Sequence, residues 1–384
     1  MREVNYFFFD INQIKKILKN SKNIKPDWNE YKDFLSNQNN NRIDQIPTDP
    51  KNEKDFEKIV SYHRFKWLKH YFFNKLSEEK NKDEICQKVL DTIKNWIIEY
   101  SKIKKPIWKA YTVSERLINF IWCLHVLKSL KKIGISDEKL IVYSIKSHLS
   151  YLEKNLEYHG KNTNNHIIKD AQGLLYGGIY FYNDPNAKRW RRIASDILTN
   201  EIKRQFSKNM VHLEQSTHYH FLVTKNYLEC FLLAKRAELN LSEELKGSVR
   251  KMVEVANDMV FPDSKMPLFS DVSPDEPYIL TVKTVLGTGG LVFKNKEFLK
   301  KIDGINLESL FFVGYDKIEN DKSVEIKESF NTKIYPKGFL AYDGNDMSLR
   351  FDCGPISFTR PGHGHEDSLS FQLWYDNHIF FRDS

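Results

Sequence analysis

The spacing of apolar residues changes once along the chain, and this change sets the fold class. From about residue 50 to 300 the spacing is helical, as when Val89, Ile93 and Trp96 fall on one helix face. Similar patterns recur near 115–130, 138–157, 166–183, 221–238 and 245–260. These segments share length but not sequence, so the pattern predicts many antiparallel helices and no solenoid repeat.

Helix boundaries are also predicted in this part of the chain. Gly134 is expected to end one helix, and Ser136 to cap the next, with Asp137 and Glu138 in its first turn. Gly160 is expected to close that helix.

Near residue 310 the helical spacing gives way to short alternating runs. FLAYDGNDMSLRFDCGPISF is broken at Gly344-Asn345 and at Gly354-Pro355, and SLSFQLWYDNHIFFRD is typical of a hairpin about Asp376-Asn377. A hairpin ending in Ile379, Phe380 and Phe381 needs further strands to cover it, because an independent β-domain needs at least three strands and an apolar face. The fold class is therefore mainly α followed by β. We expect a helical domain over 1–310 and only the start of an antiparallel β-domain, truncated at the end of the sequence, over 311–384.

Composition allows such a fold and narrows the partners. With 384 residues and 41% hydrophobic content, the chain can bury the cores of two domains. The net charge of +8 would suit an anionic partner, but 59 basic residues interleave with 51 acidic ones and mainly form a solvated surface. The four cysteines are far apart, which excludes a zinc ribbon or disulfide scaffold and predicts buried thiols. No nucleic-acid motif accompanies the basic charge, and GTGG (287–290) lacks the Lys-Ser/Thr of a phosphate loop.

Targeting signals are not visible. Asp10 interrupts the apolar start before a signal-peptide core forms, so we expect a cytoplasmic protein, or a periplasmic or secreted one if the true N-terminus is missing. The most apolar stretch, ILTVKTVLGTGGLVF, is broken by Lys283 and is shorter than the roughly 18 residues of a membrane span. We expect no membrane span, and the oligomeric state is left open.

Two polar clusters each precede an apolar helix. NTNNHIIKDAQGLLYGG contains Asn164, Asn165 and His166, and HLEQSTHYHF contains Glu214 and Tyr219. Ordinary helix caps would explain both clusters equally well, with an Asn capping the first helix and Ser216 capping the second.

A third cluster, RPGHGHEDSLSF, resists such an explanation. His363 and His365 stand two apart at the entry of a strand, hence on one face, and flanking glycines allow the backbone to approach a ligand closely. With Asp383 they would make a mixed nitrogen and oxygen set that suits zinc or manganese. Histidine is equally suited to proton transfer near neutral pH. The residues alone do not decide between a metal site and an acid-base site.

Taken in order, the three clusters resemble the heparinase II/III-like polysaccharide lyases and the related alginate lyases. That family joins an (α/α) toroid to an antiparallel β-sandwich. The matching residues are NNH (164–166), EQSTHYH (214–220) and GHGHEDSLSF (362–371) before the strand with Asp383. YHRFKWL (62–68) and WKAYTVSERLINFIW (108–122) are similar to toroid helices that carry a substrate-facing Arg and aromatics. The resemblance implies an incomplete toroid over 1–310 followed by the beginning of the sandwich.

The resemblance also implies a reaction, β-elimination at a uronate in an acidic polysaccharide. Asn165, with His166, would neutralise the substrate carboxylate, and Tyr219 and His363 would act as base and acid in an order that stays open. Substrate-binding roles fall on Trp108, Arg116, Glu214 and Arg360. His365 and Asp383 would hold one structural divalent metal, zinc being favoured, with a third ligand beyond residue 384. A catalytic His363 beside a metal-binding His365 requires the backbone to turn near Gly364.

Some positions depart from the family pattern, and two alternatives remain. Lys169 and Asp170 stand where an acid and an Asn are more usual, which puts the sugar in doubt more than the fold. A toroid glycoside hydrolase would pair Glu214 with Asp271 or Asp170, but this leaves the histidines unexplained. A non-catalytic polysaccharide-binding or surface-polysaccharide assembly protein would keep the groove without turnover.

Overall fold

The computed structural model describes residues 16–17, 56–77, 81–102, 106–272, 277–314, 331–344, 346–355, 369–376 and 378–381. Within this part of the chain, helices come first and strands follow, which confirms the predicted fold class. The change falls between Val313 and Asn331. The division into two domains at residue 310 stays a prediction.

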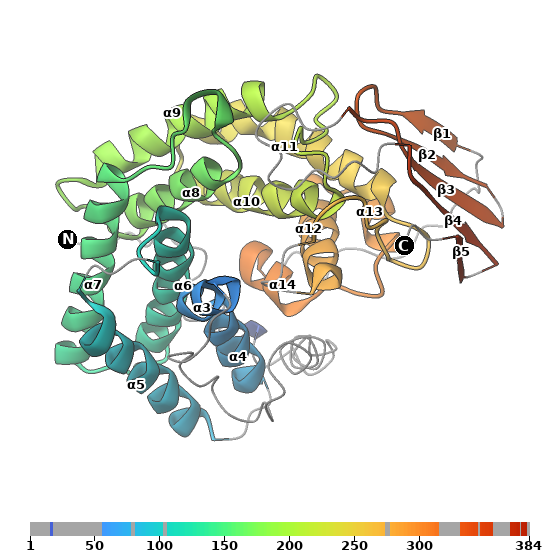
Figure 1. The fold of residues 1–384 in the computed structure, drawn as a ribbon. Helices are drawn as coiled ribbons and strands as arrows, with labels where there is room; N and C mark the ends of the chain where they lie inside the picture. The colour runs from blue at the N-terminus through green and yellow to red at the C-terminus, as the bar shows by residue number, and fades with distance from the viewer. Residues whose placement is uncertain are drawn as a thin grey trace.

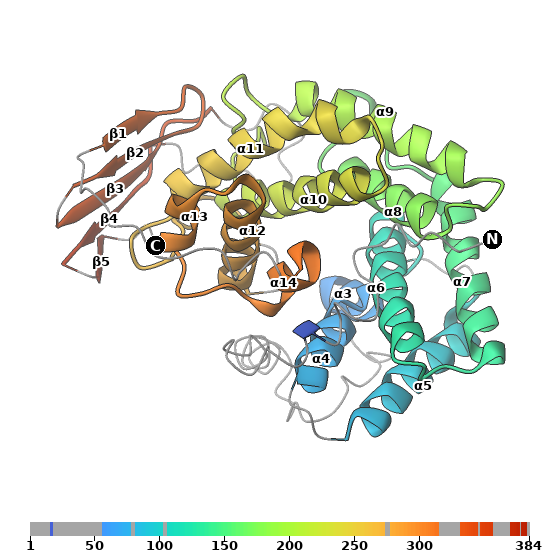
Figure 2. The same ribbon diagram turned by 180° about the vertical axis from the view of Figure 1, so that it is seen from behind.

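The helices alternate between two layers that curve into a ring (Figures 1 and 2). The inner layer contains α4 (Lys66–Ser77), α6 (Ala110–Ser129), α8 (His166–Tyr180), α10 (Thr217–Arg236) and α12 (Tyr278–Phe293). The outer layer contains α5 (Lys82–Tyr100), α7 (Ile135–Lys154), α9 (Ala187–Gln205) and α11 (Leu241–Met259). The shorter elements are α3 (Phe56–Arg64), the 3-10 turn η2 (Gly160–Asn162), α13 (Lys296–Lys300) and α14 (Leu307–Val313). This alternation is the arrangement of an incomplete (α/α) toroid.

Burial follows the layers, because an inner helix is covered on all sides and an outer helix on one. All but three residues of α10 are buried, whereas α9 buries a single stripe. Gly289 in α12 shows how closely the layers pack, since a Cβ there would lie 2.5 Å from Val253 Cγ1 of α11. The GTGG motif thus serves helix packing.

The ends of the helical arc meet. Phe73 of α4 stacks on Phe311 of α14 with ring centroids 4.0 Å apart. Lys69 of α4 pairs with Glu308 of α14 at 2.7 Å. These contacts join segments more than 230 residues apart in sequence.

The predicted helix positions are confirmed, but three boundary predictions are wrong. The helix that Gly134 was expected to end already ends at Ser129. Gly134, not Ser136, is the N-cap of α7, so Ser136 lies inside the helix; Asp137 and Glu138 do fall in its first turn. The helix then ends at Lys154, and Gly160 begins the separate turn η2 with a φ of 57°. Cys86, Cys123 and Cys230 are buried free thiols, as predicted, whereas Cys353 is half-buried.

The strands form one antiparallel sheet in sequence order at one side of the ring (Figure 1). They are β1 (Asn331–Ile334), β2 (Phe339–Asp343), β3 (Met347–Asp352), β4 (Phe371–Tyr375) and β5 (His378–Phe381). Tyr375 pairs with His378, which confirms the predicted terminal hairpin. The need for further strands to cover it stays a prediction. Among the described helices, none is long and apolar enough to cross a membrane.

Candidate active site at the entries of two inner helices

Asn165 stands at the N-cap position of α8, yet its side chain does not cap the helix. Its Nδ2 donates to Glu214 Oε2 at 2.7 Å, and its backbone N–H donates to Glu214 Oε1 at 2.9 Å. Asn164 Oδ1 instead accepts from the His166 N–H at 3.1 Å. Asn165 and Glu214 are 1% and 5% exposed. The capping explanation therefore holds for Asn164 and is wrong for Asn165, whose amide is oriented by Glu214.

Glu214 lies in the loop that leads into α10, so this carboxylate joins the entries of two neighbouring inner helices. Ser216 is the N-cap of α10, as predicted, and its Oγ accepts from the Tyr219 N–H at 3.2 Å. The same Oγ donates to the Asp271 carbonyl at 2.7 Å. These contacts fix Tyr219 in the first turn of α10, where its side chain is only half-buried while His218 and His220 are buried.

His166 is held by a carboxylate that the sequence did not single out. Its Nδ1 lies 2.7 Å from Glu157 Oε2, and Glu157 Oε1 accepts from the Tyr111 N–H at 2.9 Å. Burial opposes ionisation of Glu157, but these hydrogen bonds and the nearby histidine outweigh it and keep its pKa below the usual value. A carboxylate on Nδ1 sets the orientation of the ring and directs Nε2 to another partner. The His166 side chain is 35% exposed, so the imidazole is partly open to solvent.

The loop before α8 is further supported from the end of α9. Arg204 Nη2 donates to the Thr163 carbonyl at 2.7 Å, and Gln205 Nε2 donates to the Asn164 carbonyl at 2.9 Å. No local sequence signal marks these residues or Glu157, because the partners described here lie 9 to 46 residues away. They position the site without belonging to its motifs.

Trp108 and Arg116 lie elsewhere, in the packed interior of the ring. The Arg116 side chain is fully buried, and its Nη1 donates to the carbonyls of His63 at 3.1 Å and Ile107 at 3.0 Å. Trp108 is 3% exposed and stacks on His148 with ring centroids 4.9 Å apart. These contacts are structural and give no support to the predicted substrate-binding roles, which stay predictions.

Arg360, His363, His365 and Asp383 lie outside the described residues. Their predicted catalytic, substrate-binding and metal-binding roles therefore stay predictions. Among the residues that the structure describes, no group of three His, Cys, Asp or Glu side chains could hold a metal ion.

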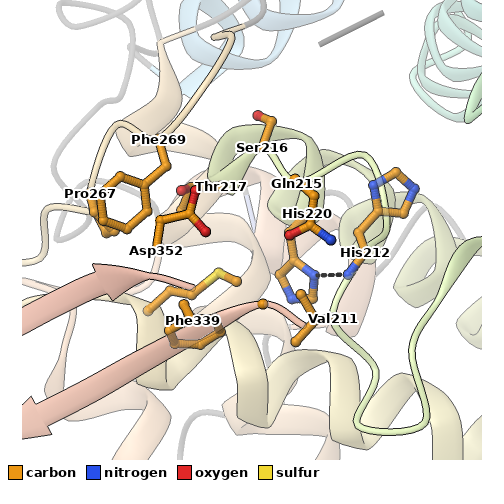
Figure 3. Close-up of a pocket in the computed structure, with 12 residues that line it drawn as sticks. Val211, His212, Gln215, Ser216, Thr217, His220, Pro267, Phe269, Phe339 and Asp352 are labelled. Carbon is orange, nitrogen blue, oxygen red and sulfur yellow. Dashed lines mark hydrogen bonds between the residues drawn. The ribbon is translucent and has the colours of Figure 1, made fainter. Parts of the chain in front are cut away.

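A small, mainly apolar pocket lies where the loop before α10 meets the sheet (Figure 3). Its lining includes Ser216, His220, Phe269, Phe339 and Asp352. His220 Nδ1 accepts from the His212 N–H at 3.4 Å, and Nε2 lies 3.1 Å from the Met252 carbonyl. Burial, with His212 nearby, lowers the pKa of His220 to about 3, so this imidazole stays neutral. Asn165, His166 and Tyr219 are not part of this lining.

Comparisons with known proteins agree with this architecture. A family model described as the heparinase II/III N-terminus matches residues 4–298. A heparin-sulfate lyase of Bacteroides stercoris is 25% identical over 232 residues, which are 57% of this chain and 31% of that protein. The heparin-sulfate lyase of Pedobacter heparinus is 24% identical over 228 residues, or 57% of this chain and 33% of that protein. The matches thus cover about a third of the length of these relatives.

Solved structures show the same fold. A crystal structure of heparinase III covers 88% of this chain and 53% of its own, with a TM-score of 0.65 and 18% identity. The structure of heparan sulfate lyase HepC from Pedobacter heparinus covers 96% of this chain and 60% of its own, with a TM-score of 0.57 and 18% identity.

Proposed function

This chain belongs to the heparinase II/III family, and we propose that it is a polysaccharide lyase that cleaves a uronate-containing anionic polysaccharide by β-elimination. The similar proteins are named heparin-sulfate lyases, so the proposed substrate class is a heparin-type glycosaminoglycan. One observation carries the proposal. The Glu214 carboxylate ties Asn165 to the entry of α10, so Asn165, His166 and Tyr219 gather at adjoining ends of two inner helices.

The first requirement of the reaction is to neutralise the uronate carboxylate, because the C5 proton beside it is very weakly acidic while the carboxylate keeps its charge. Asn165 Nδ2 carries two N–H groups, and Glu214 accepts one of them. The second N–H can donate to the substrate carboxylate, on which negative charge develops in the transition state. His166, held through Nδ1, can present Nε2 to the same carboxylate.

The second requirement is a pair of proton transfers. A base takes the C5 proton, the C5 electron pair forms the C4–C5 double bond, and the C4–O bond breaks as an acid protonates the leaving oxygen. We propose Tyr219 and His363 for these two roles. Which one is the base depends on whether the C5 proton lies syn or anti to the leaving oxygen.

The described carboxylates argue against the hydrolase alternative. Both oxygens of Glu214 accept hydrogen bonds from Asn165. Asp170 is fully buried and accepts from the Glu157 N–H at 2.8 Å. Burial raises the pKa of Asp170 well above its usual value. Neither acid is placed like one of the two substrate-facing carboxyl groups of a glycosidase.

The test is turnover measured by the ultraviolet absorbance of the unsaturated uronate, which elimination creates and hydrolysis does not. Heparin, heparan sulfate and other uronate polymers serve as substrates. Asn165→Ala and Tyr219→Phe are each expected to lower the rate by about 10² to 10⁴. Tyr143→Phe, on the exposed side of α7, is the matched control and should keep the parental rate.

Two results would refute the lyase. New reducing ends without absorbance would show hydrolysis. Retention of the polymer without any turnover, unchanged by loss of both Tyr219 and His363, would show the non-catalytic binding protein.

We further propose that His365 and Asp383 bind a structural divalent metal, with zinc suited to their donor atoms and a third ligand beyond residue 384. No step of the reaction depends on this ion. His365→Ala should lower the melting temperature and the metal content, because a structural ligand contributes through folding. His363→Ala should lose turnover and keep both. A His365→Ala protein as stable and metal-replete as the parent would refute this division of roles.

A further inference from the structure

Glu157, in the loop between α7 and η2, accepts hydrogen bonds through both oxygens of its carboxylate. His166 Nδ1 lies 2.7 Å from Oε2, and the Tyr111 N–H donates to Oε1 at 2.9 Å. The backbone N–H of Glu157 donates in turn to Asp170 Oδ2 at 2.8 Å. The side chains of Glu157 and His166 are 17% and 35% exposed. The inner helices α6 and α8 therefore hold a mostly buried carboxylate against an imidazole that is partly open to solvent.

The imidazole of His166 is also held through its face and its backbone. The rings of Tyr111 and His166 have centroids 4.7 Å apart, with their planes inclined by 43°. The Arg64 guanidinium lies 4.9 Å from the centroid of the Tyr111 ring. The His166 backbone N–H donates to Asn164 Oδ1 at 3.1 Å. These contacts keep Nδ1 directed at Glu157, so Nε2 is the nitrogen that remains for a substrate.

The position of one imidazole proton follows from these contacts. An ionised carboxylate only accepts hydrogen bonds, so His166 Nδ1 carries the proton that lies between it and Glu157. Burial opposes ionisation of Glu157, but the hydrogen bonds from His166 and Tyr111 lower its pKa and keep it charged. In a neutral imidazole with the proton on Nδ1, Nε2 is an acceptor. It would direct a lone pair at a uronate carboxylate, and two acceptors repel each other.

We propose that Glu157 is a positioning residue that lets His166 bind the uronate carboxylate only as the doubly protonated imidazolium, so that substrate binding takes up one proton. The imidazolium has an N–H at each nitrogen, one for Glu157 and one for the substrate. A carboxylate on each side stabilises its charge. The proton comes from solvent and is held on Nε2, and no other bond changes. The inference rests on the proposed binding of a uronate at Asn165 and His166, but not on which residue is base or acid.

Other titratable and charged groups lie around this pair and have to be separated from it. They are Arg64 of α3, Tyr111 of α6, Tyr151 of α7, His159 in the following loop, Asp170 of α8 and Glu214 before α10. Arginine stays charged and tyrosine neutral near pH 7. Burial raises the pKa of Asp170, so Asp170 and His159 are the groups most able to take up a proton in place of His166.

Proton uptake is measured by isothermal titration calorimetry with an N-sulfated heparin tetrasaccharide, in buffers that differ in ionisation enthalpy. The reference protein is Tyr219→Phe, so that the ligand is not cleaved; a parent without turnover is titrated itself. Uptake should rise toward about one proton per bound tetrasaccharide between about pH 6 and about pH 8, because fewer free imidazoles carry the second proton at higher pH. The affinity should fall over the same range, by up to about tenfold per pH unit.

Glu157→Gln, made in the reference protein, is the informative variant. A glutamine amide can donate to Nδ1, so a neutral imidazole can carry its proton on Nε2 and donate it to the substrate. Glu157→Gln should therefore bind with little proton uptake and with an affinity that hardly changes with pH. A merely structural effect would instead weaken binding equally at every pH and leave the uptake unchanged. His166→Gln, which retains Asp170 and His159, should also lose the uptake. His159→Gln, exposed in the same loop, is the matched control and should behave as the reference protein.

Binding without proton uptake in the reference protein would overturn the inference, as would undiminished uptake in Glu157→Gln or His166→Gln. If these two variants fail to fold, as judged by circular dichroism, the pH dependence of uptake in the reference protein decides alone. Turnover by the parent without uptake on binding would refute this inference and leave the lyase proposal standing. Binding with uptake but without turnover would do the reverse. Absence of any binding would contradict both, since both place a heparin-type uronate at His166.

Discussion

The helical ring and the sheet differ in how polar and apolar side chains are divided between buried and exposed surface. The inner helices bury apolar side chains, such as the fully buried Trp122 and Phe120. The sheet buries a mixed face, in which Ser348, Arg350, Asp352 and Gln372 lie beside Phe339, Ala341 and Trp374, all at most 7% exposed. Its other face carries the exposed apolar side chains Met347, Phe371, Tyr375 and Phe381, at 38–53% exposure. Alternation in a strand therefore identifies two faces without telling which one is covered.

The buried face of the sheet binds the end of a helix through Arg350. Arg350 Nε donates to the Met259 carbonyl at 3.1 Å, and Nη2 donates to the Val260 carbonyl at 2.7 Å. The guanidinium also pairs with Asp343 at 2.9 Å. The last carbonyls of α11 have no partner within their own helix, so the sheet supplies it. Apolar packing stabilises the ring, whereas the sheet is attached to it both by these hydrogen bonds and by Phe339 and Ala341, which belong to the same apolar core.

The largest effect is expected inside the ring. Trp122→Ala should lower the free energy of unfolding by about 3–5 kcal/mol, because the indole packs against Phe73 and Phe311 and its loss leaves a cavity. Urea denaturation measures this. Ile98→Ala, on the exposed side of α5, is the control and should stay within about 0.5 kcal/mol of the parent. If Trp122→Ala lowers the free energy of unfolding as little as Ile98→Ala does, apolar packing does not stabilise the ring as described.

The next effect tests the attachment of the sheet. Arg350→Met should cost about 3 kcal/mol, because it removes the guanidinium from the Met259 carbonyl and leaves Asp343 and the Val260 carbonyl with Lys301. Arg250→Met removes an exposed partner of Glu254 and should cost less than about 1 kcal/mol. Hydrogen exchange should become faster in β2 and β3 while α8 stays protected. Uniform loss of protection would mean that ring and sheet unfold as one unit.

A smaller change in the free energy of unfolding is expected when the pH is lowered, and it comes from histidines in the helical ring. Burial lowers the pKa of His63 and His220 to about 3, while an unfolded histidine titrates near 6.5. The unfolded chain therefore binds more protons between these values, so their contribution to stability is full above pH 6.5 and falls as the pH drops. Lowering the pH from 7.5 to 5.5 should lower the free energy of unfolding by about 1 kcal/mol for each histidine.

Asp170, whose pKa burial raises, acts in the opposite direction, so the measured quantity is a difference between proteins. Urea unfolding of His220→Gln should depend less on pH than that of the parent. His378→Gln, on the exposed strand β5, should leave the dependence unchanged. An identical pH dependence in all three proteins would contradict the assignment to His220.

The smallest effect is expected at the exposed face of the sheet. Phe381→Ser should change the free energy of unfolding by less than about 0.5 kcal/mol, because the Phe381 residue is already 53% exposed. It should also reduce self-association in sedimentation velocity, since contiguous exposed apolar side chains favour association. A cost similar to that of Trp122→Ala would show that this face is covered in solution.

Periodicity predicted the helices, the strands and the terminal hairpin, because spacing along one element is a local property. The Ser216 cap was predicted for the same reason. Glu157 was missed, and the burial of Arg116 could not be foreseen, because both depend on partners brought together by the ring. The substrate-binding role of Arg116 stays a prediction. The buried position of Arg350 in the sheet was also missed, since this residue binds carbonyls some 90 residues away.

The contact between Phe73 and Phe311 has a consequence for the order of folding. Most helices of the ring pack on a neighbour in sequence, so those contacts can form locally and early. The meeting of α4 with α14 instead closes a loop of more than 230 residues and loses chain entropy before it gains any contact. We expect this closure to come after the rate-limiting step, so that Phe73→Leu speeds unfolding and hardly changes the refolding rate in stopped-flow measurements. A slower refolding rate would instead place the closure in the folding nucleus.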